Sequence, residues 1–339
     1  MAETVERTFS TPEGCDLTVK NVSGTVSVEG WERPETEVVA TKHVDWAEVQ
    51  IQQEGRQVIV RTKDERGANG FLDWLVRHRT PKVDLAVHVP YVSNIEVTNV
   101  NGVIEISRIQ GSATTHNVDG PTRVEDVSGS VRAETVNGPI EAAQLEGEAR
   151  LKAVNGRLAL LGSRVHSLAA EAVNGEIEVQ TAIEGGGCYT FNTVNGSCHL
   201  TVAADTSAHL LVHGVNLGVD CSLPTRSLER SFGKWEATIG DAVVGRAEIS
   251  FHTVNGRLRL DSGEPGPTQA VPFAAKAPEQ PSVPPQPPEP PKTGFVAKVA
   301  DAPSGTPVPG QGISKKQVLE MLEAGQITVE EALGRLRNL

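Results

Sequence analysis

The sequence predicts an all-β chain wound as a β-solenoid, with about 18 residues per coil. From Asn99 to Leu161 a glycine occupies the fourth place of seven consecutive nine-residue units. An apolar residue fills the second place of each unit, and apolar or small residues fill the sixth and eighth. Repeats at a fixed period indicate one structural unit stacked on itself. Asn or Asp precedes the glycine only in alternate units, so two units form one coil.

An up-and-down meander of hairpins is the alternative, because Asn-Gly between alternating apolar residues is a strong hairpin signal. In a two-residue hairpin the residues that flank the loop share a face, which would bury the fifth place of each unit. That place holds, among others, Ser112, Pro121, Pro139, Glu148 and Arg157. Most of these side chains are unsuited to a core, so the solenoid is favoured.

The corners of the form Val-Asn-Gly give the most specific structural expectations. Asn and Asp accept left-handed backbone and can bond nearby main chain, and stacked coils lie about 4.8 Å apart. We therefore expect a side-chain ladder, structural rather than ligand-binding, formed by Asn101, Asp119, Asn137, Asn155, Asn174 and Asn195. We also expect two buried columns. One holds Val100, Val118, Val136 and Val154, and the other holds Ile104, Thr122, Ile140 and Leu158.

The domain organisation follows from changes in composition along the chain. Residues 1–90 are expected to form irregular coils and a cap, because the open edge of an end coil would template other strands. Residues 91–262 hold the repeats and the C-terminal strands, so 1–262 form one continuous β-domain. Residues 263–312 are rich in proline and predict a disordered linker, for which a spacer is favoured over a PxxP ligand. Residues 313–339 predict a helical hairpin with capping boxes at Ser314 and Thr328.

Two segments carry apolar residues at helical spacing. The hairpin of residues 313–339 is too small to hold a core by itself. It should pair with a copy of itself, dock on the solenoid or bind another protein, through Leu319, Leu322, Leu333 and Leu336. The second segment, with Phe71, Trp74 and Leu75, predicts either a helix that plugs the solenoid or an amphipathic contact with a partner or a membrane surface.

The composition excludes several classes of function. A net charge of −12 argues against nucleic-acid binding, which needs a basic surface. No apolar run approaches the roughly 20 residues of a transmembrane helix, and no secretory signal is visible at the N-terminus. We therefore expect a cytoplasmic protein, with the cell surface as the alternative. The four cysteines lack CxxC spacing and predict free thiols, with Cys188 and Cys198 as the pair worth testing.

The sequence offers no catalytic, metal-binding or cofactor-binding constellation, so we expect no enzyme. His209 and His213 would lie about 13 Å apart on a strand, too far to share a metal ion. GxSxG and HExxH motifs are absent from the sequence. No aromatic residue occurs between Val92 and Cys188, which argues against stacking on sugars. An enzyme, as the less favoured reading, would need its site within residues 184–252.

Three features together resemble a bacterial family known as putative adhesins. They are the entry strand VDLAVHVPYVSNIEVTNVNG, the recurring Val-Asn-Gly corners and the closing IGDAVVGRAEISFHTVNGRLRL, covering roughly residues 5–261. The resemblance implies a β-solenoid without known catalytic residues, so it supplies no site residue. The tail QVLEMLEAGQITVEEALGRLRNL is similar to a SHOCT-like helical module that accompanies this domain, at the N-terminus, in cell-envelope stress proteins.

The rigid surface of the solenoid and the tethered hairpin predict a non-enzymatic binding or scaffold protein, and the resemblance implies a role in the cell-envelope stress response. The tethered helical hairpin would then serve oligomerisation or contact with a protein partner. A surface adhesin exported without a visible signal is the alternative function.

Overall fold

The computed structural model describes residues 3–64, 81–231, 233–241 and 245–263, and the regular structure of this part is all β. The segment with Phe71, Trp74 and Leu75, the proline-rich linker beyond residue 263 and the hairpin of residues 313–339 lie outside the described residues. In the described part, no helix has the length and apolar character needed to cross a membrane.

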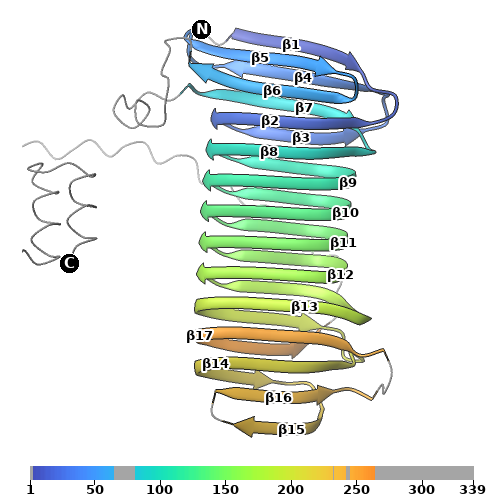
Figure 1. The fold of residues 1–339 in the computed structure, drawn as a ribbon, viewed down its shortest axis with the longest axis vertical. Coiled ribbons are helices and arrows are strands. Elements are labelled where there is room, and N and C mark those ends of the chain that lie inside the picture. The colour runs from blue at the N-terminus through green and yellow to red at the C-terminus, as the bar shows by residue number, and fades with distance from the viewer. Residues whose placement is uncertain (1–2, 65–80, 232, 242–244, 264–339) are drawn as a thin grey trace, which may run out of the picture. The chain divides into compact units, whose positions relative to one another are not determined.

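The strands join into one hydrogen-bonded sheet that winds upon itself (Figure 1). They are β1 (Glu3–Ser10), β2 (Cys15–Ser23), β3 (Val26–Trp31), β4 (Glu35–Lys42), β5 (Ala47–Glu54), β6 (Gln57–Asp64), β7 (Val83–Pro90), β8 (Ser93–Asn101), β9 (Ile104–Asp119), β10 (Thr122–Asn137), β11 (Ile140–Asn155), β12 (Leu158–Asn174), β13 (Ile177–Val202), β14 (Ala208–Cys221), β15 (Thr225–Ser231), β16 (Lys234–Ile239) and β17 (Ala247–Ser262).

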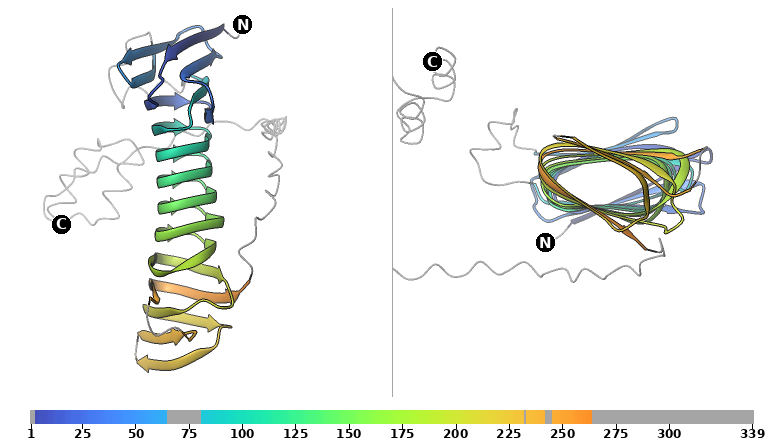
Figure 2. Two further views of the ribbon diagram at one scale, coloured as in Figure 1. Left: turned by 90° about the vertical axis from the view of Figure 1, so that its right-hand side faces the viewer. Right: turned by 90° about the horizontal axis from the view of Figure 1, so that it is seen from below.

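The middle of the β-domain is a regular solenoid. Strands β9 to β12 each run around most of a coil and pair in parallel with their neighbours. Thr122 pairs with Ile104 on one side and with Ile140 on the other, a spacing of 18 residues in each direction. Seen end-on, the coils superimpose and enclose a flattened core (Figure 2). The 18-residue coil is confirmed, and the antiparallel meander does not describe these strands.

One of the two expected buried columns is confirmed and the other is wrong. Ile104, Thr122, Ile140 and Leu158 are all buried. By contrast, Val118 and Val136 are 45% and 41% exposed, and Val100 and Val154 are only partly buried. Side chains alternate along a strand, and the buried Asn117 and Thr135 directly precede these valines. The valines therefore point outward, and the chain returns to the inward phase only after the glycine.

The second corner of each coil is built differently. Its apolar residues, Ile109, Val127 and Leu145, are buried. They follow Arg108, Asp126 and Gln144, which have left-handed backbone with φ of 59°, 53° and 53°. A left-handed residue breaks the alternation of the strand and returns the next side chain to the core. The nine-residue pattern treats the two corners alike, although only one of them buries its valine, leucine or isoleucine.

The N-terminal strands form one further coil and a cover over it. Strands β2 and β3 pair in parallel with β8 and β9, in the register of the repeats. Strand β4 pairs antiparallel with β1 and β7, and β5 pairs antiparallel with β6 (Figure 1). Antiparallel strands at the end of a parallel stack stop its propagation, because the next coil has no parallel edge to extend.

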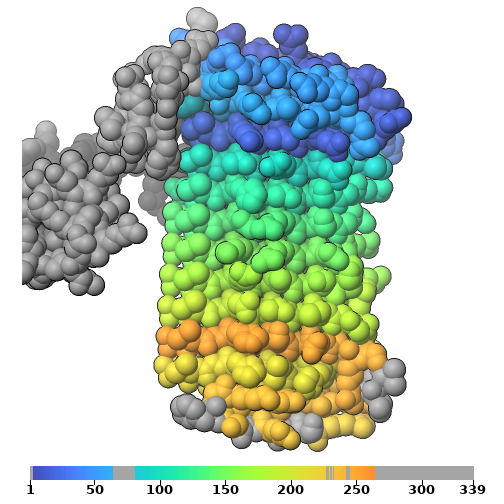
Figure 3. Space-filling model, viewed as in Figure 1, coloured from blue at the N-terminus to red at the C-terminus, as the bar shows by residue number. Residues whose placement is uncertain are grey.

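At the C-terminal end of the solenoid the spatial order of the strands departs from their order in the sequence. Strand β17 pairs in parallel with β13 on one side and with β14 on the other. The orange band of β17 accordingly lies between the bands of β13 and β14 in the space-filling view (Figure 3). Strand β16 pairs antiparallel with β14, and β15 pairs with β16. The last strand of the β-domain thus lies between two strands that precede it.

Replacing Gly138 with alanine tests the stacking of the coils. A Cβ atom at this position would lie 2.1 Å from the carbonyl oxygen of Gly120, and the backbone has a φ of 150°. We expect Gly138→Ala to lower the free energy of unfolding by about 2–3 kcal/mol, measured by urea denaturation.

Gly186→Ala is the matched control, because Gly186 has a φ of 78° but open space where the Cβ would lie. It should cost only about 1 kcal/mol. Equal losses for the two variants would show that close contact between coils contributes nothing at Gly138.

Candidate functional site

The corner that carries the Val-Asn-Gly pattern presents a long apolar strip on the outside of the solenoid. The valine of each coil stands above the valine of the next, because the neighbouring Asn or Asp residues are paired in the strand register. Exposed fractions are 37% for Val173, 40% for Val194 and 69% for Val215. We name this strip the valine column. In spatial order it comprises Val22, Val100, Val118, Val136, Val154, Val173, Val194, Val254 and Val215.

A ladder of asparagine side chains runs along one side of the valine column. The Nδ2 of Asn155 donates to the Oδ1 of Asn137 at 3.0 Å, and Asn174 donates to Asn155 at 3.1 Å. Asn195 donates to Asn174 at 3.2 Å. Asn101 and Asp119 occupy the two preceding places of the same column, in register with Asn137. Each amide that both donates and accepts connects three coils, so the ladder links coils as well as satisfying its own polar atoms.

The ladder continues beyond the residues expected from the sequence. Asn255 donates to Asn195 at 3.0 Å, and Asn216 donates to Asn255 at 2.6 Å. Asn255 and Asn216 join the ladder because β17 lies between β13 and β14. Asn216 is followed by Leu217 rather than glycine, so it lacks the corner signal that marks the other members.

Sequence reasoning also missed asparagines that lie inside the corners. The Nδ2 of Asn99 donates to the carbonyl oxygen of Gly24, and that of Asn117 donates to the carbonyl oxygens of Gly102 and Gly120. The Nδ2 of Asn21 likewise donates to the carbonyl oxygen of Val83. These buried amides satisfy main-chain oxygens at the corners, where the strand ladder is interrupted.

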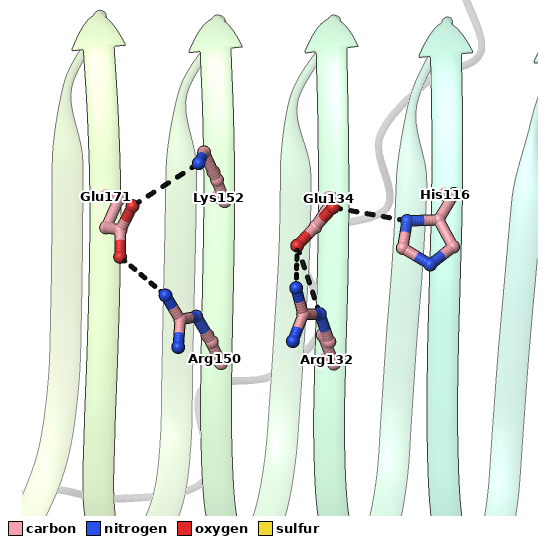
Figure 4. Close-up of polar contacts among 6 residues, drawn as sticks. All are labelled: His116, Arg132, Glu134, Arg150, Lys152 and Glu171. Carbon is pink, nitrogen blue, oxygen red and sulfur yellow. Dashed lines mark hydrogen bonds and ion pairs between the residues drawn. The ribbon is translucent and has the colours of Figure 1, made fainter.

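A row of polar side chains runs along the other side of the valine column, two residues before each valine. We name it the charged row. In spatial order it comprises Lys20, Thr98, His116, Glu134, Lys152, Glu171, Asn192, His252 and His213. In its middle, basic and acidic side chains alternate along the stack, with His116, Glu134, Lys152 and Glu171 on successive strands (Figure 4).

Ion pairs hold the two carboxylates of the charged row in place (Figure 4). Glu134 lies 3.2 Å from the Nδ1 of His116 and 2.6 Å from the Nη2 of Arg132. Glu171 lies 3.1 Å from the Nη2 of Arg150 and 3.6 Å from the Nζ of Lys152. Each glutamate therefore contacts two basic side chains. For Glu134 one is on its own coil and one on the neighbouring coil, and for Glu171 both are on the neighbouring coil. These contacts fix the position of each carboxylate on this surface.

The pKa of the Glu134 carboxyl is lowered from its ordinary value. Partial burial acts to raise this pKa, but the hydrogen bond and positive charge of Arg132 outweigh it, together with the charges of His116 and Lys152. Glu134 is therefore ionised at neutral pH, with a side chain only 28% exposed.

A shallow groove of about 530 Å³ lies along the C-terminal half of the valine column. Val173, Val194, Val215 and Val254 line it together with His213 and His252. The two imidazole rings are stacked, with centroids 5.4 Å apart and planes 8° from parallel. The groove is thus apolar along its floor and bordered by aromatic edges, which suits an apolar occupant rather than an ion.

The region of residues 184–252 contributes to a second cavity of about 740 Å³, which is more polar. It contains an ion pair between His199 and Asp261, 3.0 Å apart, and the sulfur atoms of Cys198 and Cys221 lie on residues that line it. Burial raises the pKa of both thiols, and Cys198 is fully buried. Neither thiol is therefore an activated nucleophile, which would need a lowered pKa.

The cysteine pair suggested by the sequence is not joined. Cys188 is exposed and Cys198 is buried, and both are free thiols. Within the residues that the structure describes, no group of His, Cys, Asp and Glu side chains has an arrangement that could hold a metal ion.

Comparisons with known proteins give similarities of low degree. No family model and no curated protein matches this chain. A crystal structure of a "putative cell adhesion protein" from Clostridium sporogenes aligns with 77% of this chain and 100% of its own, at 7% identity and a TM-score of 0.26. A "putative adhesin" from Bacteroides fragilis aligns with 76% of this chain and 97% of its own, at 10% identity and a TM-score of 0.36.

A third solved structure is a "putative lipid binding protein" from Parabacteroides distasonis. It aligns with 75% of this chain and 96% of its own, at 11% identity and a TM-score of 0.27. Similarity at this level assigns neither a family nor a ligand to this chain.

The Glu134→Gln variant tests the charge network in the charged row. Because the pKa of Glu134 is lowered on folding, its ionised form contributes stability above the ordinary glutamate pKa of about 4.3, and this contribution is lost as the pH falls through the folded-state value. We expect Glu134→Gln to cost up to about 1 kcal/mol at pH 7 and much less in acid, measured by urea denaturation at both pH values.

Glu125→Gln is the control, since Glu125 is an exposed glutamate on the same strand, β10. Its effect should be small at both pH values. A loss for Glu134→Gln that stays constant with pH would contradict the electrostatic account.

Proposed function

We propose that this chain is a non-enzymatic binding or scaffold protein whose contact surface is the valine column with its flanking rows. The observation that carries the proposal is the inverted placement of threonine and valine at three corners of the valine column. Thr135, Thr193 and Thr253 are buried, while the valine that follows each of them is at least 40% exposed. The hydroxyl groups of these threonines have no hydrogen-bond partner among the described residues.

The two side chains have nearly the same shape but opposite preferences for water. A buried hydroxyl without a partner costs free energy, and an exposed isopropyl group gains none from burial. Both residues favour extended backbone equally well. The isolated solenoid would therefore be more stable with valine at the buried position and threonine at the exposed position. The observed order is explained by an occupant that buries the valine column.

The surrounding structure suits a contact surface. Parallel strand pairing and the asparagine ladder fix the spacing of the valines, so binding needs little ordering of this surface. Contiguous apolar surface with a polar border is the usual form of a protein interaction site. The alternating basic and acidic side chains of His116, Glu134, Lys152 and Glu171 add specificity for orientation and register.

The proposal assigns a second contact to residues 313–339. There the expected helical hairpin, with Leu319, Leu322, Leu333 and Leu336, provides oligomerisation or binding of a protein partner at the end of a proline-rich tether. A role in the cell-envelope stress response is supported by the sequence resemblance. The same resemblance supports the surface adhesin as the second candidate, and cell fractionation distinguishes a cytoplasmic from a surface-exposed protein.

A charged substitution in the valine column tests the proposed contact surface. We expect Val173→Asp to reduce several-fold the amount of partner captured from an extract of the native cell, because a carboxylate must be desolvated when the surface is covered. Val92→Asp is the matched control, since Val92 is 61% exposed and lies outside the valine column. Equal capture by wild type and Val173→Asp would contradict the proposal.

A shortened chain, residues 1–263, tests the independence of the tail. The break follows Gly263, whose N–H donates to the carbonyl oxygen of Val202 and belongs to the β-domain. We expect this chain to retain its β-type circular dichroism and its melting temperature, and to lose any partner that binds the hairpin. A large drop in melting temperature would show that residues beyond 263 stabilise the solenoid directly.

A further inference from the structure

We infer that the occupant of the valine column is a second copy of this chain, bound antiparallel about a two-fold axis that crosses the strip between Val154 and Val173. This inference rests on the proposed function, because it names the partner of the same surface. It is carried by the order of side chains in the valine column and the charged row.

The proposed axis superimposes the strip from Val100 to Val215 of one copy on the same part of the other. The valine column has nine levels from Val22 to Val215, and the axis lies between the fifth and the sixth, which leaves Val22 outside the overlap. Val154 then faces Val173 of the partner subunit, and Val136 faces Val194 of the partner subunit. Rotation about an axis across the strip reverses the stack but keeps each row on its own side. The charged row therefore meets the charged row, and the asparagine ladder meets the asparagine ladder.

The charges are complementary in this arrangement. Lys152 faces Glu171 of the partner subunit, and the two-fold axis repeats the pair. Within one copy these side chains already lie 3.6 Å apart. Across the interface they form a square of alternating charges rather than two isolated pairs. Glu134 faces Asn192 of the partner subunit, whose amide can donate to it, and no like charges lie opposite each other in the middle of the strip.

A parallel dimer lacks this complementarity. An axis along the strip would exchange its two sides, so that the charged row would face the asparagine ladder of the partner subunit. Lys152 and Glu171 would then be covered without a charge of opposite sign from the other copy. They would lose hydration, and no attraction across the interface would compensate for that loss. The alternating row thus selects the antiparallel orientation.

The area available is sufficient for a weak dimer. Seven steps of about 4.8 Å make the overlapping part of the strip, from Val100 to Val215, about 34 Å long. With a width of about 18 Å across the three rows, it offers roughly 600 Å² per copy, somewhat below the ~800 Å² per partner of a standard interface. We therefore expect dissociation in the micromolar range and a monomer in dilute solution.

Sedimentation velocity of the full chain across micromolar concentrations is the primary test. The wild type should shift from monomer to dimer. Val173→Asp should raise the dissociation constant at least about tenfold, because it places two carboxylates near the axis. Val92→Asp, which carries the same change outside the strip, should dimerise like the wild type. Circular dichroism of each variant shows that the β-domain is folded.

Charge exchange tests the antiparallel orientation. Lys152→Glu and Glu171→Lys should each weaken the dimer several-fold, since each places like charges opposite each other. The double variant should recover part of the lost affinity, because the pairs between the subunits are restored with reversed sign, although the lysine at position 171 then lies beside Arg150. If the double variant stays as weak as the single variants, the proposed pairing of these residues is wrong.

Cross-linking tests the register. In a Cys188→Ser background, which removes the exposed native thiol, Val136→Cys protein mixed with Val194→Cys protein should form a disulfide-linked dimer. Neither variant alone should do so, because the two copies of either residue would lie about 14 Å apart along the strip. Cross-linking of Val136→Cys to itself would show a parallel dimer and overturn the inference.

Two further outcomes would refute the second copy as the occupant. One is a wild-type chain that stays monomeric at all concentrations tested, and the other is a dimer that survives Val173→Asp but is lost when residues 313–339 are deleted. A monomeric chain that still captures a different partner through Val173 leaves the proposed function intact. Capture that is indifferent to Val173→Asp refutes the proposed function as well.

Discussion

Close contact between the backbones of successive corners is the constraint on which the rest of this structure depends. At the valine corner the carbonyl oxygen of one glycine occupies the space that a Cβ atom would need on the glycine of the next coil. The distance from an ideal Cβ to that oxygen is 2.3 Å at Gly120, 2.1 Å at Gly138 and 2.0 Å at Gly156. Any other residue would force the coils apart, because real Cβ atoms do not approach oxygen so closely. The glycine period is thus what allows the corners to keep the spacing that strand pairing sets.

The position of the glycines determines what the corner presents to solvent. Asn137 and its equivalents directly precede the glycines, so the spacing of strands brings their amides within hydrogen-bond distance of one another. One residue earlier the strand alternation directs the valine outward. A repeat that requires glycine at one place therefore fixes the positions of two outward columns of side chains, one of which holds the asparagines and the other the valines. The identity of the outward residue remains free, and the choice of valine over threonine there is the feature that fold stability does not explain.

The sequence predicted those parts of the fold that depend on period, and failed where local backbone geometry or long-range order decides. The 18-residue coil and the buried column of Ile104, Thr122, Ile140 and Leu158 follow from spacing alone. The direction of Val118 and Val136 does not, because the two corners of a coil share one pattern and differ in backbone. Left-handed Arg108, Asp126 and Gln144 have no common side-chain signal for this conformation. The position of β17 between β13 and β14 could not be predicted either, because pairing between distant strands does not change the local periodicity of the sequence.

The candidate site was partly visible in the sequence for the same reason. The members of the asparagine ladder from Asn137 to Asn195 carry the corner pattern, whereas Asn216 does not and depends on the position of β17. The charged row could not be recognised as a surface until the valine beside it was placed outside. His116, Glu134, Lys152 and Glu171 are of different types and follow no period, so pattern searches pass over them.

That lack of period gives the charged row its significance for recognition. A solenoid offers nearly the same backbone and the same valine at every coil, so an apolar column alone would accept a partner at many registers with similar affinity. Only departures from the repeat can distinguish one register from the next. The charges at His116, Glu134, Lys152 and Glu171 are such departures, and their neighbours Arg132 and Arg150 hold the glutamates in fixed positions. The periodic residues of this chain therefore build the surface, and the aperiodic residues beside them determine what it can bind and in which orientation.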